Sequence, residues 1–256
     1  MMYKNIFDTH AHYDDERFSE DSEELLSSFP ENGVAGVVSC GVNAQSSQKN
    51  IELSKKYPFI YAAVGFHGLN TEDLTEDYID ILKELIKNEK VVAIGEIGLD
   101  YHYEKKTREL QLKIFSEQIR LANEYGLPVI VHDREAHQDT LDILKDLRPK
   151  GVLHCFTGSV EMAKEIVKLG MYIGLGGAVT FKNAVKPVEV AKFVPEDRLL
   201  LETDAPYMTP VPFRGKRCTS LHIPYTAQKI AEIRETDVQS ILDISCKNAK
   251  ELFKID

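Results

Sequence analysis

The sequence predicts an α/β protein folded as a (β/α)8 barrel, the TIM barrel, and three observations support this prediction. Short runs rich in β-branched residues alternate along the chain with polar turns and amphipathic stretches, which is the pattern of βαβ units. Eight such runs occur, as many as this barrel has strands. The length of 256 residues allows one large core, and barrels of this type reach it as one domain. We therefore expect a single domain over residues 1–256.

The eight predicted strands are almost continuously apolar rather than alternating, as in VVAIG and LLLETD. This is expected of parallel strands that are covered on both faces. In chain order, they are Asn5–His10, Val34–Gly41, Ile60–Gly65, Val91–Ile97, Pro128–His132, Gly151–Cys155, Met171–Gly176 and Leu199–Thr203. Eight parallel strands with eight crossovers favour a closed barrel over an open sheet, while loop lengths alone leave both open.

Helices are predicted between the strands from apolar residues at helical spacing. In Lys105–Tyr125 the apolar side chains fall on one stripe, and Gly126 stands where a helix would end. Another helix is predicted over Asp237–Phe253, and Thr236-x-x-Gln239 before it is interpreted as a capping box.

Composition excludes several classes of protein. The four cysteines are scattered and form no C-x-x-C pair, which argues against a disulfide framework or a thiolate zinc site. The N-terminus lacks a signal-peptide pattern, and no run of about 18 apolar residues occurs. We expect a cytoplasmic protein with no membrane association and no obligatory protein partner. The formal net charge of -10 argues against a broad basic face for duplex DNA, so any nucleic-acid contact must be local or helped by bound cations.

Polar side chains suited to chemistry gather on the carboxyl side of six predicted strands. They are Asp8, His10, His12, His67, Glu96, His132, Arg134, His154, Glu202 and Asp204. In a barrel these strand ends surround one mouth, which holds the active site. Residues two apart on a strand share a face. Three pairs are therefore predicted to point together: His10 with His12, His132 with Arg134, and Glu202 with Asp204.

A metal centre explains this group better than a set of core hydrogen bonds. One histidine at a strand end is more often a satisfied core residue than a ligand. Four or more histidines with two acids in one mouth would each need a partner, at about 1–3 kcal/mol per unsatisfied group. Divalent cations would satisfy them together. Imidazole and carboxylate ligands without thiolate suit zinc, manganese or iron, and carboxylates with water also admit magnesium.

Long motifs then point to a family. The segments FDTHAH, VVAIGEIGLDYHY, LPVIVHDR, HCFTGS and LLLETDAPY-x-x-P-x-P-x-RGKR stand in the order and spacing of the TatD family of metal-dependent nucleases. The chain resembles this family from end to end. The resemblance implies a metal-dependent hydrolase barrel with two divalent cations. It implies that His10 and His12 bind one cation together with Asp204, that His132 and His154 bind the other, and that Glu96 bridges the two.

The resemblance also implies residues that contact substrate. His67 falls where the family has a histidine near the substrate phosphate, although the usual Gly-x-His-Pro ends here in Gly68. Arg134 shares a face with His132, and a guanidinium fork matches phosphate oxygens. Arg214 and Arg217 belong to the family's basic loop, which continues here as Cys-Thr-Ser where Asn-Glu-Pro is common. The alternative for this loop is a solvated charge cluster.

The function that the resemblance implies is hydrolysis of phosphodiester bonds, by 3′-to-5′ exonuclease action on single-stranded DNA, with RNA as a further substrate. Asp204 is predicted to be both ligand and general base, with coordination alone as the alternative. The chief rival is an amidohydrolase that cleaves an amide or an ester, including the ester of aminoacyl-tRNA, because fold alone does not separate these chemistries. A non-catalytic metal-binding scaffold is a second rival. The segment Tyr101–Tyr103 is open to two interpretations, stacking on a base or packing of a loop.

Overall fold

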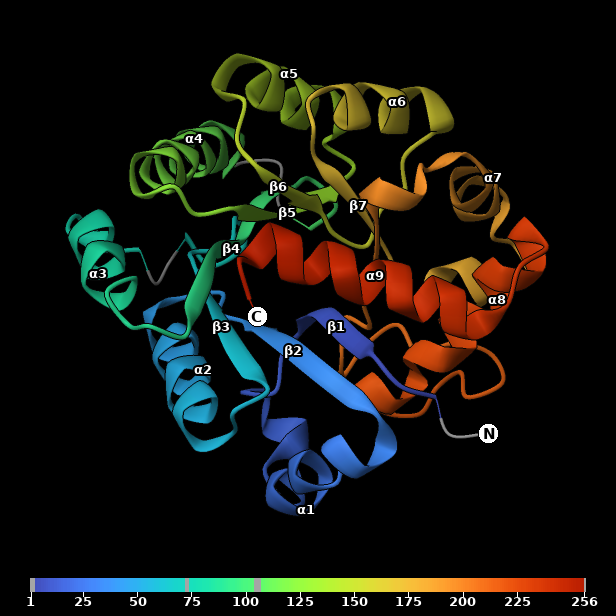
Figure 1. The fold of residues 1–256 in the computed structure, drawn as a ribbon. Coiled ribbons are helices and arrows are strands. Elements are labelled where there is room, and N and C mark those ends of the chain that lie inside the picture. The colour runs from blue at the N-terminus through green and yellow to red at the C-terminus, as the bar shows by residue number, and fades with distance from the viewer. Residues whose placement is uncertain (1–2, 72–73, 104–106, 256) are drawn as a thin grey trace.

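Eight parallel strands form a barrel in the computed structural model, which describes residues 3–71, 74–103 and 107–255 (Figure 1). The strands are β1 (Ile6–Ala11), β2 (Val34–Cys40), β3 (Ile60–Val64), β4 (Val91–Asp100), β5 (Val129–Arg134), β6 (Gly151–Leu153), β7 (Tyr172–Leu175) and β8 (Leu199–Leu201). Each pairs with its neighbour in chain order. A parallel bridge between Ala11 and Ala205 joins the first strand to the segment after the last. The predicted barrel is confirmed.

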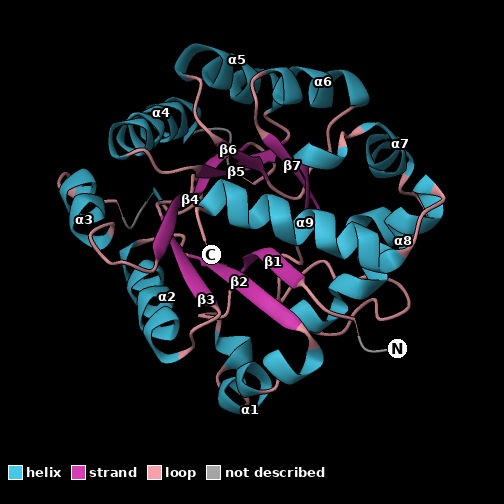
Figure 2. Cartoon of the chain, in the orientation of Figure 1, coloured by secondary structure: helices cyan, strands magenta, loops and turns pink. Residues whose placement is uncertain are grey.

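Helices surround the barrel (Figure 2). They are α1 (Ser22–Ser27), α2 (Ala44–Lys56), α3 (Tyr78–Leu85), α4 (Arg108–Tyr125), α5 (His137–Leu147), α6 (Val160–Lys168), α7 (Val185–Phe193), α8 (Ile223–Arg234) and α9 (Val238–Phe253). The helix predicted over Lys105–Tyr125 corresponds to α4, and residues 105 and 106 lie outside the described residues. It ends at Gly126, whose φ of 65° is the left-handed conformation that glycine adopts readily.

The predicted start of α9 is wrong by one residue. Asp237 is the N-cap, and its carboxylate accepts a hydrogen bond from the Ser240 N–H at 3.1 Å. Thr236 does not cap the helix. Its N–H instead donates to the Ala231 carbonyl at 3.0 Å, just beyond the end of α8.

One end of the barrel is closed by α9. This helix crosses the near end of the barrel in Figure 1, and its Cys246, Ala249, Leu252 and Phe253 belong to the same buried cluster as residues of the barrel strands. The Asn248 side chain donates to the carbonyl of Leu199 at 2.8 Å, at the beginning of β8. The amino ends of the strands are therefore covered. A larger cluster of buried residues packs the strands against the surrounding helices.

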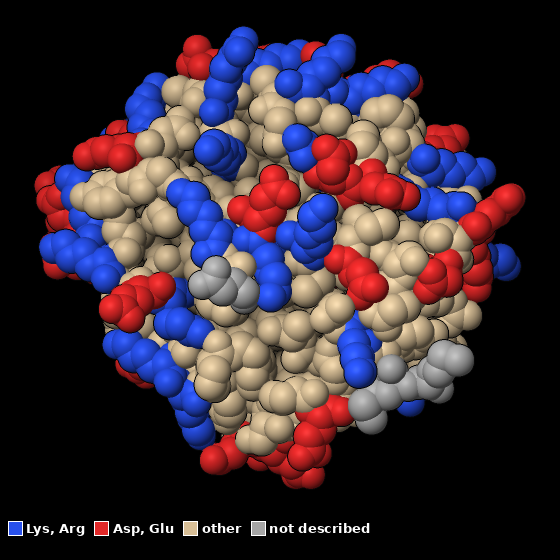
Figure 3. Space-filling model, in the orientation of Figure 1, with Lys and Arg blue, Asp and Glu red and all other residues tan. Residues whose placement is uncertain are grey.

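The surface on the α9 side carries charges of both signs. Basic and acidic side chains are interspersed there over most of the visible face (Figure 3). Among the helices that the structure describes, none has the length and apolar character needed to span a membrane.

Candidate metal centre

The six residues predicted as metal ligands lie together at the end of the barrel opposite α9. In chain order, they are His10 in β1, His12 just after β1, Glu96 in β4, His132 in β5, His154 just after β6, and Asp204 just after β8. All but His10 line a cavity of about 460 Å³, and His10 is completely buried. Because they come from five different strands, the closed barrel itself brings them together.

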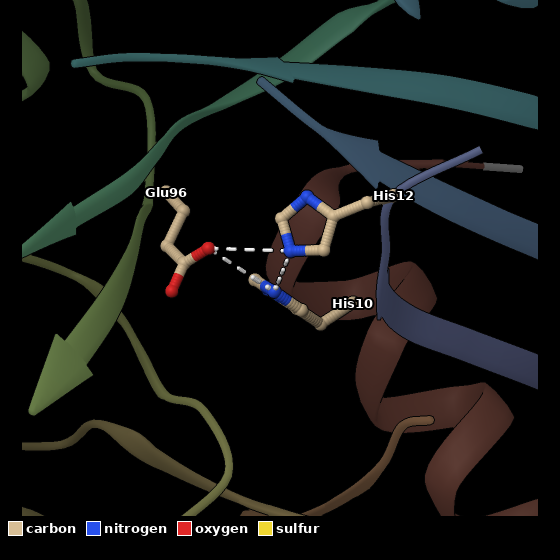
Figure 4. A group of neighbouring side chains, drawn as sticks. All are labelled: His10, His12 and Glu96. Atoms are coloured by element: carbon tan, nitrogen blue, oxygen red, sulfur yellow. Dashed lines mark hydrogen bonds and ion pairs between the residues drawn. The ribbon is translucent and has the colours of Figure 1, made fainter. Parts of the chain in front are cut away.

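One carboxylate oxygen of Glu96 faces the first histidine pair (Figure 4). Its Oε2 lies 3.5 Å from Nε2 of His10 and 3.3 Å from Nε2 of His12. The two Nε2 atoms are 3.1 Å apart. His10 and His12 point to the same side, as the alternation of side chains along β1 predicts.

The other oxygen of Glu96 faces the second histidine pair. Its Oε1 lies 2.7 Å from Nδ1 of His132 and 2.8 Å from Nε2 of His154. These two ring nitrogens are 3.2 Å apart. Glu96 therefore offers one oxygen to each pair, which is the arrangement that a bridging carboxylate requires.

Asp204 completes the first group. Its Oδ1 lies 3.5 Å from Nε2 of His10 and 3.6 Å from Nε2 of His12. Its backbone has a φ of 61°, a conformation that costs energy for a residue with a side chain. Two hydrogen bonds fix this conformation. The Asp204 N–H donates to the carbonyl of His10 at 2.9 Å, and its carbonyl accepts from the N–H of Tyr207 at 2.8 Å.

A backbone partner settles which nitrogen of His12 can bind a cation. Nδ1 lies 2.9 Å from the carbonyl oxygen of Cys40. Because a carbonyl only accepts hydrogen bonds, Nδ1 must carry the proton. In the neutral ring the lone pair is then on Nε2, the atom that faces His10, Glu96 and Asp204. Histidine ligands commonly have such a partner on the second nitrogen.

His67 has the opposite arrangement. Its Nδ1 accepts a hydrogen bond from the N–H of Leu69 at 3.1 Å, so the neutral ring carries its proton on Nε2, which lies 3.6 Å from Oε1 of Glu96. Burial, together with the nearby His132, lowers the pKa of His67 to about 3. His67 is therefore a neutral hydrogen-bond donor toward the cavity, and this tautomer leaves no free lone pair for a metal ion.

Gly68, where the resemblance leads one to expect proline, stands in a confined space. A Cβ atom added there would lie 2.7 Å from the carbonyl oxygen of Gly98 and 2.8 Å from Oε1 of Gln111. The loop that carries His67 thus packs directly onto β4 and α4, and only a residue without a side chain fits.

The charges in the centre favour a cation. Burial disfavours the ionised form of Glu96, but the histidines around it, His154 foremost, hold the pKa of Glu96 well below its usual range. Burial likewise opposes a charge on His154, but Glu96 outweighs it and raises the pKa of His154 to about 10. Burial opposes ionisation of Asp204 too, yet hydrogen bonds to His10 and His12 lower the pKa of Asp204. A metal ion would replace protons on these rings.

Two acids support the second histidine pair from behind. Oδ2 of Asp100 lies 3.2 Å from Nε2 of His132. Oε1 of Glu202 lies 3.6 Å from Nδ1 of His154, and Glu202 is completely buried. Sequence reasoning gave Asp100 no role and Glu202 no specific one. Asp100 could have been found, because it lies four residues after Glu96 in β4 and so shares its face.

The structure does not bring all the predicted arginines to the centre. Arg134 lines the cavity, and its guanidinium carbon lies 4.8 Å from the ring centroid of Tyr103. Arg214 lies over the ring of Phe181 at 3.7 Å, and Arg217 pairs with Asp21 at 2.8 Å. Neither of these two lines the cavity.

The residues fit divalent cations. In the neutral ring of His12, the Nε2 lone pair faces a second ring nitrogen and two carboxylate oxygens at 3.1 to 3.6 Å. A cation between these atoms would be coordinated by them. Three overlapping groups of potential ligand atoms each fall within 4.8 Å: His10, His12 and Glu96; His10, His154 and Asp204; His67, Glu96 and His132. The tautomer of His67 argues against the last group. Imidazole with carboxylate suits zinc, manganese or iron and admits magnesium.

Comparison with known proteins identifies the family of the chain. The family model described as TatD related DNase matches residues 7–254. The chain is 45% identical over 254 residues to a protein of Bacillus subtilis (strain 168) named "Uncharacterized metal-dependent hydrolase YabD", covering 98% of this chain and 100% of the relative. It is 32% identical over 259 residues to the "3'-5' ssDNA/RNA exonuclease TatD" of Erwinia tasmaniensis, covering 98% of this chain and 100% of that protein.

A solved structure gives the same result for the whole fold. The crystal structure of YJJV, a TatD homolog from Escherichia coli K12, superposes with a TM-score of 0.93 at 32% sequence identity, and covers 100% of both chains. The family model, the relatives and this structure agree over essentially the full length. The chain belongs to the TatD-related DNase family and is a metal-dependent hydrolase.

Proposed function

We propose that this hydrolase removes nucleotides from the 3′ end of single-stranded DNA, and of RNA as a further substrate. The observation that carries the proposal is the position of Arg134, which lines the same cavity as the cation ligands. A guanidinium fork matches two oxygens of a phosphodiester, whereas a neutral amide offers it a single carbonyl oxygen. Two relatives, in Erwinia tasmaniensis and Salmonella typhimurium, are named "3'-5' ssDNA/RNA exonuclease TatD", which supports the same substrate and direction.

The proposal assigns the ligands to two divalent cations. His10, His12 and Asp204 would hold one cation, His132 and His154 would hold the other, and Glu96 would contribute to both. When bound, the cations supply Lewis-acid activation of a water molecule and of a phosphodiester oxygen. They also offset the carboxylates of the cavity, so that an anionic strand end can enter it.

Three side chains act on the reacting groups. Asp204 accepts a proton from the attacking water, because its carboxylate reaches the cavity beside His10 and His12. Arg134 contacts the non-bridging oxygens of the scissile phosphate and stabilises the charge that develops on them. His67 donates its Nε2 proton in a hydrogen bond to a phosphate oxygen and stays neutral throughout. As water adds to phosphorus, the bond from phosphorus to the leaving oxygen breaks.

The test follows release of nucleotides from single-stranded oligonucleotides labelled at the 3′ or the 5′ end. The protein is stripped with EDTA and then given Mg²⁺, Mn²⁺ or Zn²⁺ in turn. We expect the 3′ label to be released first, as a mononucleotide, and only with metal. Turnover confined to amide or ester substrates under every metal would overturn the proposal and favour the amidohydrolase alternative.

A pair of variants separates chemistry from folding. Asp204→Asn removes the proposed base and should lower kcat by at least 100-fold, within the range that general-base catalysis contributes. Asp146→Asn is the matched control, since Asp146 is exposed on α5. An Asp204→Asn protein with unchanged kcat would remove Asp204 as the base.

A further inference from the structure

Two exposed tyrosines stand at the rim of the metal centre. Tyr103 is 67% exposed and Tyr207 is 46% exposed, and both line the cavity that holds the cation ligands. The other exposed tyrosines in the described ranges, Tyr125 and Tyr225, do not line it. The exposed rings at the site therefore need an explanation of their own.

The topology places the two rings on opposite sides of the centre. Tyr103 follows β4 and Tyr207 follows β8. In a closed barrel whose eight strands are ordered from β1 to β8, the fourth and the eighth lie across from each other. Glu96, which faces both histidine pairs, lines the same cavity as the two rings. A chain that crosses the centre would meet one ring on each side of it.

Each ring is backed by an arginine. The guanidinium carbon of Arg134 lies 4.8 Å from the ring centroid of Tyr103, and that of Arg17 lies 4.1 Å from the ring centroid of Tyr207. Asp15 holds Arg17 through two hydrogen bonds of 3.0 Å. These cation–π contacts occupy one face of each ring. His102 also lies edge to face with Tyr103, with 4.8 Å between the ring centroids. The two tyrosines still keep 67% and 46% of their surface exposed, on rings whose positions are set by these contacts.

The cavity has little else with which to hold a long anion. Arg134 is the one arginine or lysine among its described lining residues. The acids that line it are Asp14, Asp15, Glu96, Asp100 and Asp204. Phosphate neutralisation by basic side chains is therefore weak along this path, and binding must draw on another part of the substrate. Every nucleobase has a flat face that stacks on an aromatic ring, whatever its sequence.

We propose that Tyr103 and Tyr207 are the stacking platforms for the two bases that flank the scissile phosphate. The inference rests on the proposed nuclease function and adds that each tyrosine serves one base. A phosphodiester joins two nucleosides, so a phosphate centred on the cations puts one base on either side of it. The platforms position the strand end without reading its sequence.

The test combines protein variants with abasic substrates and uses the metal-loaded enzyme. Tyr103→Ala and Tyr207→Ala are assayed on three single-stranded oligonucleotides: one intact, one abasic at the 3′-terminal position, and one abasic at the penultimate position. On the intact strand, each variant should raise KM about tenfold, within the range measured for one base stacked on one aromatic ring. The increase in KM caused by each variant should disappear on one of the two abasic strands. The strand on which it disappears should differ between the two tyrosines.

Controls keep the result specific. Tyr125→Ala removes a tyrosine of similar exposure, 45%, at the end of α4 and should leave KM unchanged on all three strands. Tyr207→Phe and Tyr103→Phe keep the stacking face and should retain a KM near that of the wild type. The phenylalanine control matters most for Tyr207, because its backbone N–H donates to the carbonyl of Asp204, a proposed cation ligand.

The outcomes separate the two proposals. If the wild type trims no oligonucleotide under any metal, the nuclease function fails and the platforms fail with it. Suppose instead that the wild type trims all three strands, and that the alanine variants raise KM by the same factor on intact and abasic strands or do not raise it. The nuclease function then stands and the platforms are refuted.

Discussion

Oε1 of Glu202 lies 3.6 Å from Nδ1 of His154, in a space that a side chain at position 174 would fill. A Cβ added to Gly174 would come within 2.4 Å of the Glu202 carboxylate. The same oxygen of Glu202 also accepts the N–H of Cys155 at 2.5 Å, which ties the carboxylate to the backbone next to His154. Gly174 thus leaves room for an acid directly behind a proposed ligand, and the Cys155 peptide holds the acid there. A carboxylate is a common partner for the second nitrogen of a ligating imidazole.

Glu202→Gln should therefore weaken cation binding while leaving the fold intact. Glutamine keeps the size of the side chain but removes the negative charge that favours a cation at His154. We expect a loss of 10- to 100-fold in affinity for the more weakly held cation, about the size found when such supporting partners are changed. Calorimetric titration of the chelator-stripped protein measures it. Glu161→Gln, exposed on α6, is the control; equal affinities in the two variants would mean that Glu202 only fills space.

Gly68→Ala should destabilise the protein. The new Cβ would meet the carbonyl of Gly98 and the side chain of Gln111, and Gln111 cannot move aside freely because it accepts from the N–H of Asp100 at 2.8 Å. Overpacking of this kind costs about 1–3 kcal/mol of unfolding free energy, measurable by urea denaturation.

Gly176→Ala is the matched control for Gly68→Ala. Its Cβ would lie no closer than 3.4 Å to the nearest atom, an ordinary contact. We expect a change within about 0.5 kcal/mol for this variant. Equal stability of the two variants would show that the loop carrying His67 can move to make room for a Cβ atom without loss of stability.

Strands were the most predictable part of the fold because each is an apolar run covered on both faces. Their ends were less so. The strand predicted to reach Cys155 stops at Leu153, and Cys155 has a φ of 43° that ends the extended backbone. The strand predicted to end at Ile97 continues to Asp100, because residues 97 to 100 pair with β5 as far as Arg134. This extension is what brings Asp100 to His132.

The sequence also predicted which histidines gather, but it held no information on their tautomers. Those depend on the Cys40 carbonyl beside His12 and the Leu69 N–H beside His67. Every residue carries a carbonyl, and all but proline carry an N–H, so no pattern of side chains marks these partners. Arg217 illustrates the converse. Its motif pointed to phosphate, whereas the fold pairs it with Asp21 and places it over the ring of Phe18.

The cysteines should react slowly with thiol reagents in the folded protein. Burial raises the pKa of Cys40 and Cys155 well above the usual thiol value, and raises that of Cys218 to about 12. Since only the thiolate attacks, little reactive species is present at pH 8, and the rate should increase with pH. Ellman's reagent at pH 8 should find less than one thiol per chain in buffer and all four in denaturant. Rapid labelling of two or more thiols in buffer would contradict the packing around them.

Binding of a single strand should depend only weakly on salt. The slope of log K against log salt concentration is about −0.7 for each phosphate neutralised on a single strand. Arg134 is the one arginine or lysine among the described residues that line the cavity. We expect a slope of about −0.7 to −1.5, measured by fluorescence anisotropy with metal-loaded Asp204→Asn, in which the strand is not consumed. Arg134→Gln should make the slope shallower by about 0.7. Arg217→Gln should leave it unchanged, because the guanidinium of Arg217 is already paired with Asp21. A slope steeper than about −3, which becomes shallower in Arg214→Gln or Arg217→Gln, would contradict this prediction. It would show that the basic loop binds the strand, as its motif suggests, and that Arg217 leaves Asp21 when substrate binds.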